Sequence, residues 1–168
     1  MDGPCAECGY AYASVRATDA PARVRSAANE LVTSLAGADP AALSRAPGDS
    51  QWSVLEYAGH VRDVLVVQRE RVLMVRNQQG QTARPMARDE RVQWGEYAEC
   101  TAEQLCAEVA LVAEWLAHTL ELLDDEDWSR TLVYSYPQPA ERSLEWLATH
   151  TVHELVHHRQ DVERLLSA

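Results

Sequence analysis

The sequence predicts an all-α protein, a four-helix bundle that follows an irregular N-terminal tail. Three observations support this prediction: segments with helical apolar periodicity, capping signals where those segments begin, and loops rich in proline, glycine or acidic residues between them. The chain has 168 residues, enough for one domain with a proper core. We see no repeat or linker, so we expect a tail over 1–19 and a bundle over 20–168.

Two of the four long helices are predicted in the first half of the chain. The first covers residues 21–36 and has a proline at its start, where proline is favoured. A loop over 39–51 ends it. Ser53 and Glu56 then match a capping box, which predicts a second helix running to about Gln78.

A loop over residues 80–100 is expected next, with a short helix around 90–97. The segment from Thr101 to Gln104 is another capping box and predicts a third helix over about 102–123. An acidic run ends that helix.

The segment 128–142 is predicted to be an irregular excursion with a short hairpin around 131–136. Ser143 then caps the fourth helix, which runs to about Leu166. Aromatic side chains of the excursion could either wall a functional site or plug one end of the bundle: Trp128, Tyr134 and Tyr136.

The charge balance narrows the class of partner. Fifteen basic and 26 acidic residues give a net charge of −11, which disfavours nucleic acids and anionic membranes. Apolar runs are too short to cross a bilayer, and the N-terminus does not resemble a signal peptide, so a cytoplasmic protein is expected. All basic residues are arginine, and lysine, isoleucine and phenylalanine are absent, which indicates GC-rich codon usage.

Histidines and a glutamate on the fourth helix are candidate metal ligands. On a helical wheel, Glu154 and His158 fall on or beside the arc of buried leucines and valines. His153 and His157 fall largely on the opposite side and are expected to point outward. The two pairs differ by one residue, so a local bulge would exchange them.

On the second helix, His60 shares a face with Tyr57, Val64 and Val67 and is expected to point inward. His60, Glu154 and His158 would form a His₂Glu set with an open position, as in catalytic zinc sites. The alternatives are a satisfied core histidine and a surface contact between the side chains four residues apart. No general base can be named, and Asp63 and Glu56 are expected in solvent.

Two segments resemble motifs of the DinB/YfiT-like superfamily: Trp52–Asp63, with its Trp-Ser opening before a histidine, and His153–Val162. The resemblance covers about residues 20–168. It implies a four-helix bundle with a divalent metal held by three ligands near one end. Many members use three histidines, which keeps His153 and His157 open as ligands. The branch similar to mycothiol-dependent maleylpyruvate isomerase uses His, Glu and His, which fall on His60, Glu154 and His158.

The resemblance also implies an activity. A divalent metal, with zinc expected and nickel an ion that purification could introduce, would activate a low-molecular-weight thiol such as mycothiol or bacillithiol. The thiol would then be transferred to an electrophilic small molecule or would assist its isomerisation. The GC-rich bias is compatible with an actinobacterial source, which would favour mycothiol.

The resemblance leaves other functions and assemblies open. The alternatives are a non-catalytic stress or regulatory bundle that binds metal, and a lyase or hydrolase in which the metal activates water. Related bundles pair through helices, so a homodimer is a further option.

Cys5 and Cys8 resemble a zinc knuckle, half of a second, structural zinc site. The missing ligands could come from another copy of the chain or from residues elsewhere in it: Cys100, Cys106 and His118. A redox pair and two unpaired thiols in the tail are the alternatives. The tail could also fold over the first metal site and present a thiolate there.

Overall fold

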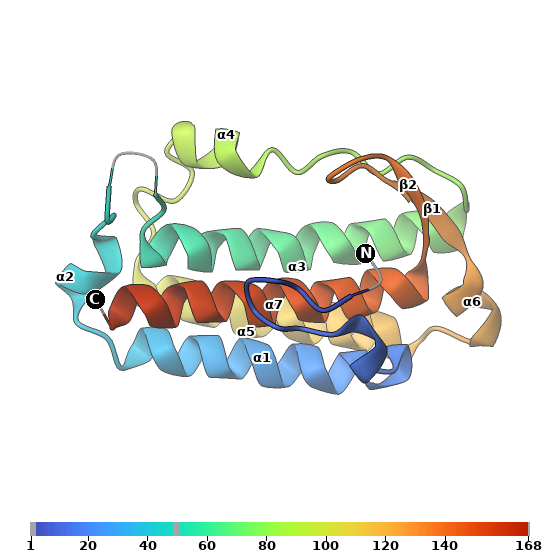
Figure 1. Ribbon diagram of the computed structural model, residues 1–168, viewed down its shortest axis with the longest axis horizontal. Helices are drawn as coiled ribbons and strands as arrows, with labels where there is room; N and C mark the ends of the chain where they lie inside the picture. The colour runs from blue at the N-terminus through green and yellow to red at the C-terminus, as the bar shows by residue number, and fades with distance from the viewer. Residues whose placement is uncertain (1–2, 49–50, 168) are drawn as a thin grey trace.

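The computed structural model describes residues 3–48 and 51–167; residues 49 and 50 of the predicted loop, and Met1, Asp2 and Ala168, lie outside it. Four long helices of the described chain lie side by side (Figure 1): α1 (Ala20–Ala36), α3 (Val54–Asn77), α5 (Ala102–Glu121) and α7 (Leu144–Leu166). The predicted four-helix bundle is confirmed.

Local capping accounts for where the helices begin. Ser53 accepts a hydrogen bond from the Glu56 backbone, and Glu56 accepts one from the Ser53 backbone, so the predicted capping box opens α3. Ser143 caps α7 as predicted. Thr101 caps α5, but the Gln104 side chain donates to Glu108 rather than back to the cap.

The connections determine which helices become neighbours. Both α1 and α3 pack against α5 and α7. Because α3 and α5 run in the same direction in Figure 1, the chain returns between them along the outside of α3. This crossover, residues 78–101, carries the short helix α4 (Arg88–Gln93), close to the predicted short helix.

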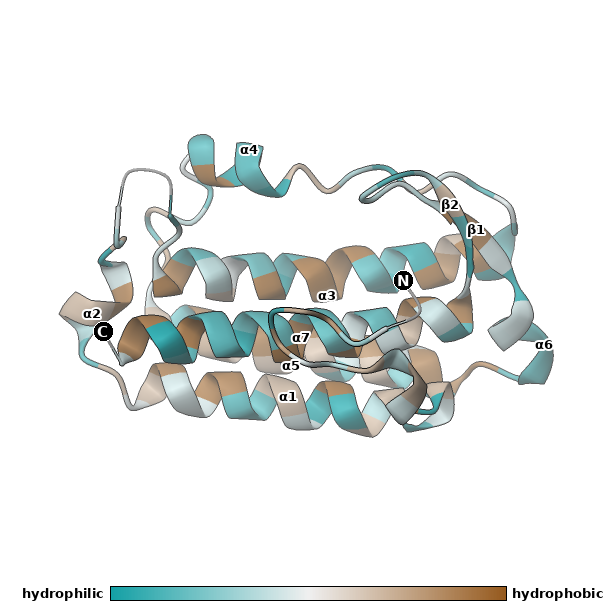
Figure 2. Ribbon diagram, in the orientation of Figure 1, coloured by the Kyte–Doolittle hydropathy of each residue, from teal (hydrophilic) through white to brown (hydrophobic). Residues whose placement is uncertain are grey.

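Leucines dominate the buried core and come from all four long helices, for example Leu31, Leu65, Leu105, Leu116, Leu147 and Leu155. Each long helix carries both apolar and polar residues (Figure 2), as a helix with one buried stripe requires. Within the described residues, no helix combines the length and the apolar character needed to span a bilayer.

The crossover packs closely against α3, with the ring of Tyr97 lying on Gly59. A Cβ on Gly59 would lie 2.5 Å from a ring carbon of Tyr97, so only glycine lets the ring pack there. The Tyr97 hydroxyl donates to Asp63 at 2.8 Å, and Arg91 donates to the same carboxylate at 2.6 Å. The expectation that Asp63 and Glu56 are solvated was wrong: Asp63 is buried under the crossover, and Glu56 is half-buried in the capping box.

Smaller elements close the ends of the bundle. They are α2 (Pro40–Ser44), α6 (Asp125–Ser129) and an antiparallel hairpin of β1 (Thr131–Tyr134) and β2 (Ala140–Ser143). The hairpin was predicted, although its second strand begins beyond the expected range. The tail forms two 3₁₀ turns, η1 (Tyr12–Ser14) and η2 (Ala17–Asp19), and crosses the face of α7 (Figure 1).

Candidate metal centre

The structure brings together the three residues that the sequence analysis selected. His60 comes from α3, and Glu154 and His158 come from α7. One potential ligand atom from each lies within 4.8 Å of those of the other two. His158 Nε2 lies 3.7 Å from a Glu154 oxygen, and the rings of His60 and His158 meet edge to face at 4.8 Å between centroids. We call this group the metal centre.

His60 carries the clearest sign of a missing ligand. Only 1% of the residue is exposed, and within the described chain neither Nδ1 nor Nε2 has a hydrogen-bond partner. A buried, unpaired polar group costs about 1–3 kcal/mol, so such groups are normally satisfied. Burial, together with the charge of His158, lowers the pKa of His60 to about 3. The ring is therefore neutral at pH 7, the form that binds metal, and the donor set fits a divalent cation.

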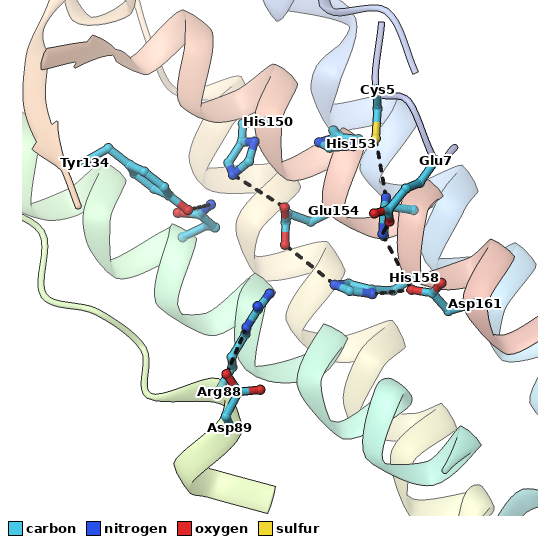
Figure 3. Close-up of polar contacts among 12 residues, drawn as sticks. Cys5, Glu7, Arg88, Asp89, Tyr134, His150, His153, Glu154, His158 and Asp161 are labelled. Carbon is cyan, nitrogen blue, oxygen red and sulfur yellow. Dashed lines mark hydrogen bonds and ion pairs between the residues drawn. The ribbon is translucent and has the colours of Figure 1, made fainter. Parts of the chain in front are cut away.

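Opposite charges hold the other two potential ligands, Glu154 and His158, in place. Burial alone would raise the pKa of Glu154, but the attraction of His158 and His150 lowers it to about 2. Burial opposes a charge on His158, but Asp161 and Glu154 outweigh it and raise its pKa. His158 donates through Nδ1 to Asp161 at 2.8 Å, leaving Nε2 to face Glu154 (Figure 3). A carboxylate in this position orients a metal-binding histidine and makes it more basic.

A cavity of about 710 Å³ opens beside the metal centre, with Glu154 and His158 in its wall. Two arginines also line it, Arg88 from α4 and Arg142 from β2. Arg88 points toward Glu154 and His158 in Figure 3. Two cationic side chains beside a metal centre, in a chain of net charge −11, favour an anionic ligand in this cavity.

The aromatic residues of segment 128–142 divide between the two roles considered, which were to wall a functional site and to plug one end of the bundle. Tyr136 lines the cavity, with Arg88 over its ring. Tyr134 is buried against Trp146 and His150, and its hydroxyl accepts from Gln68. Trp128 is half-buried and packs on the core instead.

The helical wheel was wrong about His153, and in part about His157. His153 is only 8% exposed, and His157 is half-buried. The tail covers this side of α7: the ring of Tyr10 stacks on His153, and Cys5 lies beside His157. Among the described residues, the potential ligands that gather around His60 are Glu154 and His158, not the His153–His157 pair.

Cys5 and Cys8 lie beside other possible metal ligands than those considered from the sequence. Cys5 and Cys8 lie with His153 and His157, all four donor atoms being within 4.8 Å of one another. The other candidates lie elsewhere: the thiols of Cys100 and Cys106 contact the backbone carbonyls of Glu96 and Val32, and His118 faces Glu121 in solvent.

The two tail thiols differ in acidity. Burial opposes ionisation of Cys5, but the backbone amides of Cys8 and Glu7 and the ring of His157 outweigh it and lower its pKa to about 7. Burial raises the pKa of Cys8. The tail does fold beside the metal centre, since Cys5 lines the cavity.

Sequence reasoning missed three residues of the site. Asp161 could have been found, because it follows His158 by three residues and so shares its helix face. Tyr12, whose hydroxyl lies 2.7 Å from His150 Nδ1 and 2.9 Å from His153 Nδ1, gave no local signal. Arg88 gave none either, because only the path of the crossover brings it to the cavity.

Comparisons with known proteins agree with this architecture. A search of curated proteins finds no significant match. Among solved structures, YfiT from Bacillus subtilis matches with a TM-score of 0.76 at 14% identity, over 88% of this chain and 86% of that one. It is described as a probable metal-dependent hydrolase with an unusual four-helix bundle topology. The family model of the DinB superfamily matches residues 21–162. The chain, a four-helix bundle with His and Glu side chains grouped as metal ligands would be, belongs to the DinB superfamily.

Proposed function

We propose that the protein is a metal-dependent enzyme that transfers a low-molecular-weight thiol to a small anionic electrophile. The observation that carries this proposal is His60: buried, neutral and without a hydrogen-bond partner in the described chain, it faces Glu154 and His158 beside an open cavity. A set of three protein ligands leaves a coordination position for a substrate, whereas structural zinc takes four.

His60, Glu154 and His158 would hold the ion, which we expect to be zinc. When bound, it would lower the pKa of a thiol in the remaining position, which is otherwise near 8.5, and so increase the thiolate fraction. Asp161 keeps the Nδ1 proton on His158, so that Nε2 stays free to bind. Arg88 and Arg142 bind the carboxylate or phosphate groups of thiol or electrophile and orient them.

The reaction adds the thiol sulfur to an electrophilic carbon. With an aryl chloride, a C–S bond forms and the C–Cl bond breaks. Chloride leaves, and the thiol proton passes to solvent. With an electrophile whose double bond can rotate after addition, expulsion of the same thiol would give an isomer. The chain itself needs no covalent nucleophile for either outcome.

Hydrolysis is the second candidate, because the structural neighbour YfiT is described as a probable metal-dependent hydrolase. The same ligand set would then serve water as the nucleophile. The two candidates differ in one requirement, since only transfer needs a small thiol. A non-catalytic bundle would bind metal but turn over neither kind of substrate.

Metal content tests the basis of both enzymatic candidates. Elemental mass spectrometry measures the bound metal. We expect wild type to contain zinc and a His60→Ala/His158→Ala variant to lose the ion of this centre. His118→Ala is the matched control, because His118 is exposed on α5. Equal metal in wild type and the double variant after zinc loading contradicts the proposal.

Turnover then separates the candidates. The zinc-loaded protein is assayed with mycothiol, bacillithiol or glutathione and an anionic aryl chloride, 4-chloro-3,5-dinitrobenzoate, and separately with carboxylic and phosphate esters without thiol. Thiol-dependent product that disappears in the double variant supports transfer, and ester cleavage without thiol supports hydrolysis. For an anionic substrate, Arg88→Gln should raise KM about tenfold while kcat changes little, as loss of one charged hydrogen bond predicts.

A further inference from the structure

The tail residues Cys5 to Tyr10 form a preshaped loop. The Cys5 amide donates to the Tyr10 carbonyl at 2.8 Å, and the Gly9 amide donates to the Cys5 carbonyl at 2.9 Å. Gly9 has φ of +73°, a backbone conformation that favours glycine. This closed turn holds both cysteines in a short knuckle, as the two thiolates of half a zinc site require.

The other half of the arrangement lies on α7. His153 and His157 are four residues apart and therefore share a helix face. The hydroxyl of Tyr12 hydrogen-bonds His153 Nδ1 at 2.9 Å, which leaves Nε2 as the free ring nitrogen. Nε2 is buried and has no hydrogen-bond partner among the described residues, in a residue that is 8% exposed. A buried nitrogen without a hydrogen-bond partner, beside two thiols, is best explained by a metal ion that it binds.

The distances suit a tetrahedral ion. The four donor atoms lie within 4.8 Å of one another, and Cys5 Sγ lies 3.7 Å from His157 Nδ1. Zn–S and Zn–N bonds of about 2.3 and 2.1 Å at a tetrahedral angle place sulfur and nitrogen about 3.6 Å apart. His157 Nε2 faces Glu7 at 3.2 Å and Asp161 at 3.7 Å, carboxylates that would orient the ring through its other nitrogen.

We infer that four side chains bind a second, structural zinc ion that fastens the N-terminal tail to α7. They are those of Cys5, Cys8, His153 and His157. With four protein ligands, this site is closed, in contrast to the three-ligand metal centre. The tail is already docked by Tyr10, which donates to the Thr149 carbonyl at 2.9 Å, and by Gln160, which donates to the Cys8 carbonyl at 3.3 Å. The inference does not depend on the proposed enzymatic activity.

The first experiment measures zinc in protein purified under reducing conditions. Wild type should hold about one zinc ion per chain more than a Cys5→Ser/Cys8→Ser variant, whether or not the metal centre is filled, since the tail site binds one ion. The matched control Cys100→Ser/Cys106→Ser should equal wild type, because among the described residues neither thiol belongs to a group that could hold a metal ion. Equal zinc in wild type and the tail variant, or a Cys5–Cys8 disulfide in the reduced preparation, overturns the inference.

Cobalt substitution gives a second readout that does not require the tail variant to fold. Cobalt-loaded wild type should show thiolate-to-cobalt charge-transfer absorption and the visible bands of a tetrahedral ion. The His60→Ala/His158→Ala variant should keep the charge-transfer band, because its tail site is intact. Absence of this band from wild type overturns the inference. Loss of zinc by the double variant with the charge-transfer band retained would identify two separate sites.

Discussion

Replacing His60 by leucine should make the metal-free protein more stable, although it removes a proposed metal ligand. Both ring nitrogens are buried without partners among the described residues. An unsatisfied buried polar group costs about 1–3 kcal/mol, and leucine is apolar and similar in size. Imperfect packing of leucine offsets part of the gain, by up to about 1.5 kcal/mol. We therefore expect the variant to gain about 1–2 kcal/mol at pH 8 with a chelator present.

Urea unfolding measures this difference. With a slope of about 2 kcal/mol per molar urea, the midpoint should rise by about 0.5–1 M. Adding zinc at about 100 times its Kd should stabilise wild type through this centre by about 2.7 kcal/mol and the variant not at all, which reverses the order of stability. Any zinc bound by the tail contributes equally to both proteins and cancels.

The control is His118→Leu, which should change stability by less than about 0.5 kcal/mol because this side chain is exposed. A metal-free His60→Leu protein that is less stable than wild type by more than about 1 kcal/mol would contradict this prediction. His60 would then be an ordinary core histidine with satisfied contacts.

Three further predictions concern the same region. In metal-free protein, the advantage of His60→Leu should widen by about 2 kcal/mol between pH 8 and pH 5. The reason is that the pKa of His60 is near 6.5 in the unfolded chain but about 3 in the folded protein, so wild type loses stability as the pH falls. The same difference in urea midpoint between variant and wild type at both pH values would contradict this. Asp161→Asn should weaken zinc binding at the metal centre about 10–100-fold by loosening the orientation of His158, measured by competition with a chromogenic chelator. An unchanged affinity would assign Asp161 a role in the helix only. Gly59→Ala should cost about 1–3 kcal/mol in urea unfolding, because its Cβ would lie 2.5 Å from the Tyr97 ring; an unchanged midpoint would show that the ring moves away freely.

The helices could be predicted because their signals are local. Ser53 and Glu56 cap α3 through contacts three residues apart, and the apolar stripe of α7 follows directly from its sequence. The return path of the crossover gave no such signal. Its cover over Asp63 depends on contacts with Arg91 and Tyr97, far along the chain.

The proposed metal ligands could be predicted from the sequence only in part, for the same reason. A helical wheel finds Glu154 and His158 because it assumes that a helix is buried only against the bundle core. His153 is buried by another route, under a tail whose Tyr10 reaches α7 across 139 residues of sequence. The sequence therefore contained no sign that Cys5 lies beside His157, because only the folded tail brings the two together.

The cavity beside the metal centre has a composite wall. Helix α7 supplies Glu154 and His158, whereas the facing side chains come from excursions outside the helical core: Cys5 in the tail, Arg88 in the crossover and Arg142 in the hairpin. Excursions of this kind tolerate insertion and replacement far better than a packed helix does. Under the proposed function, many of the side chains that contact substrate would therefore lie outside the long helices, and a hairpin grafted from a relative would test whether specificity moves with it.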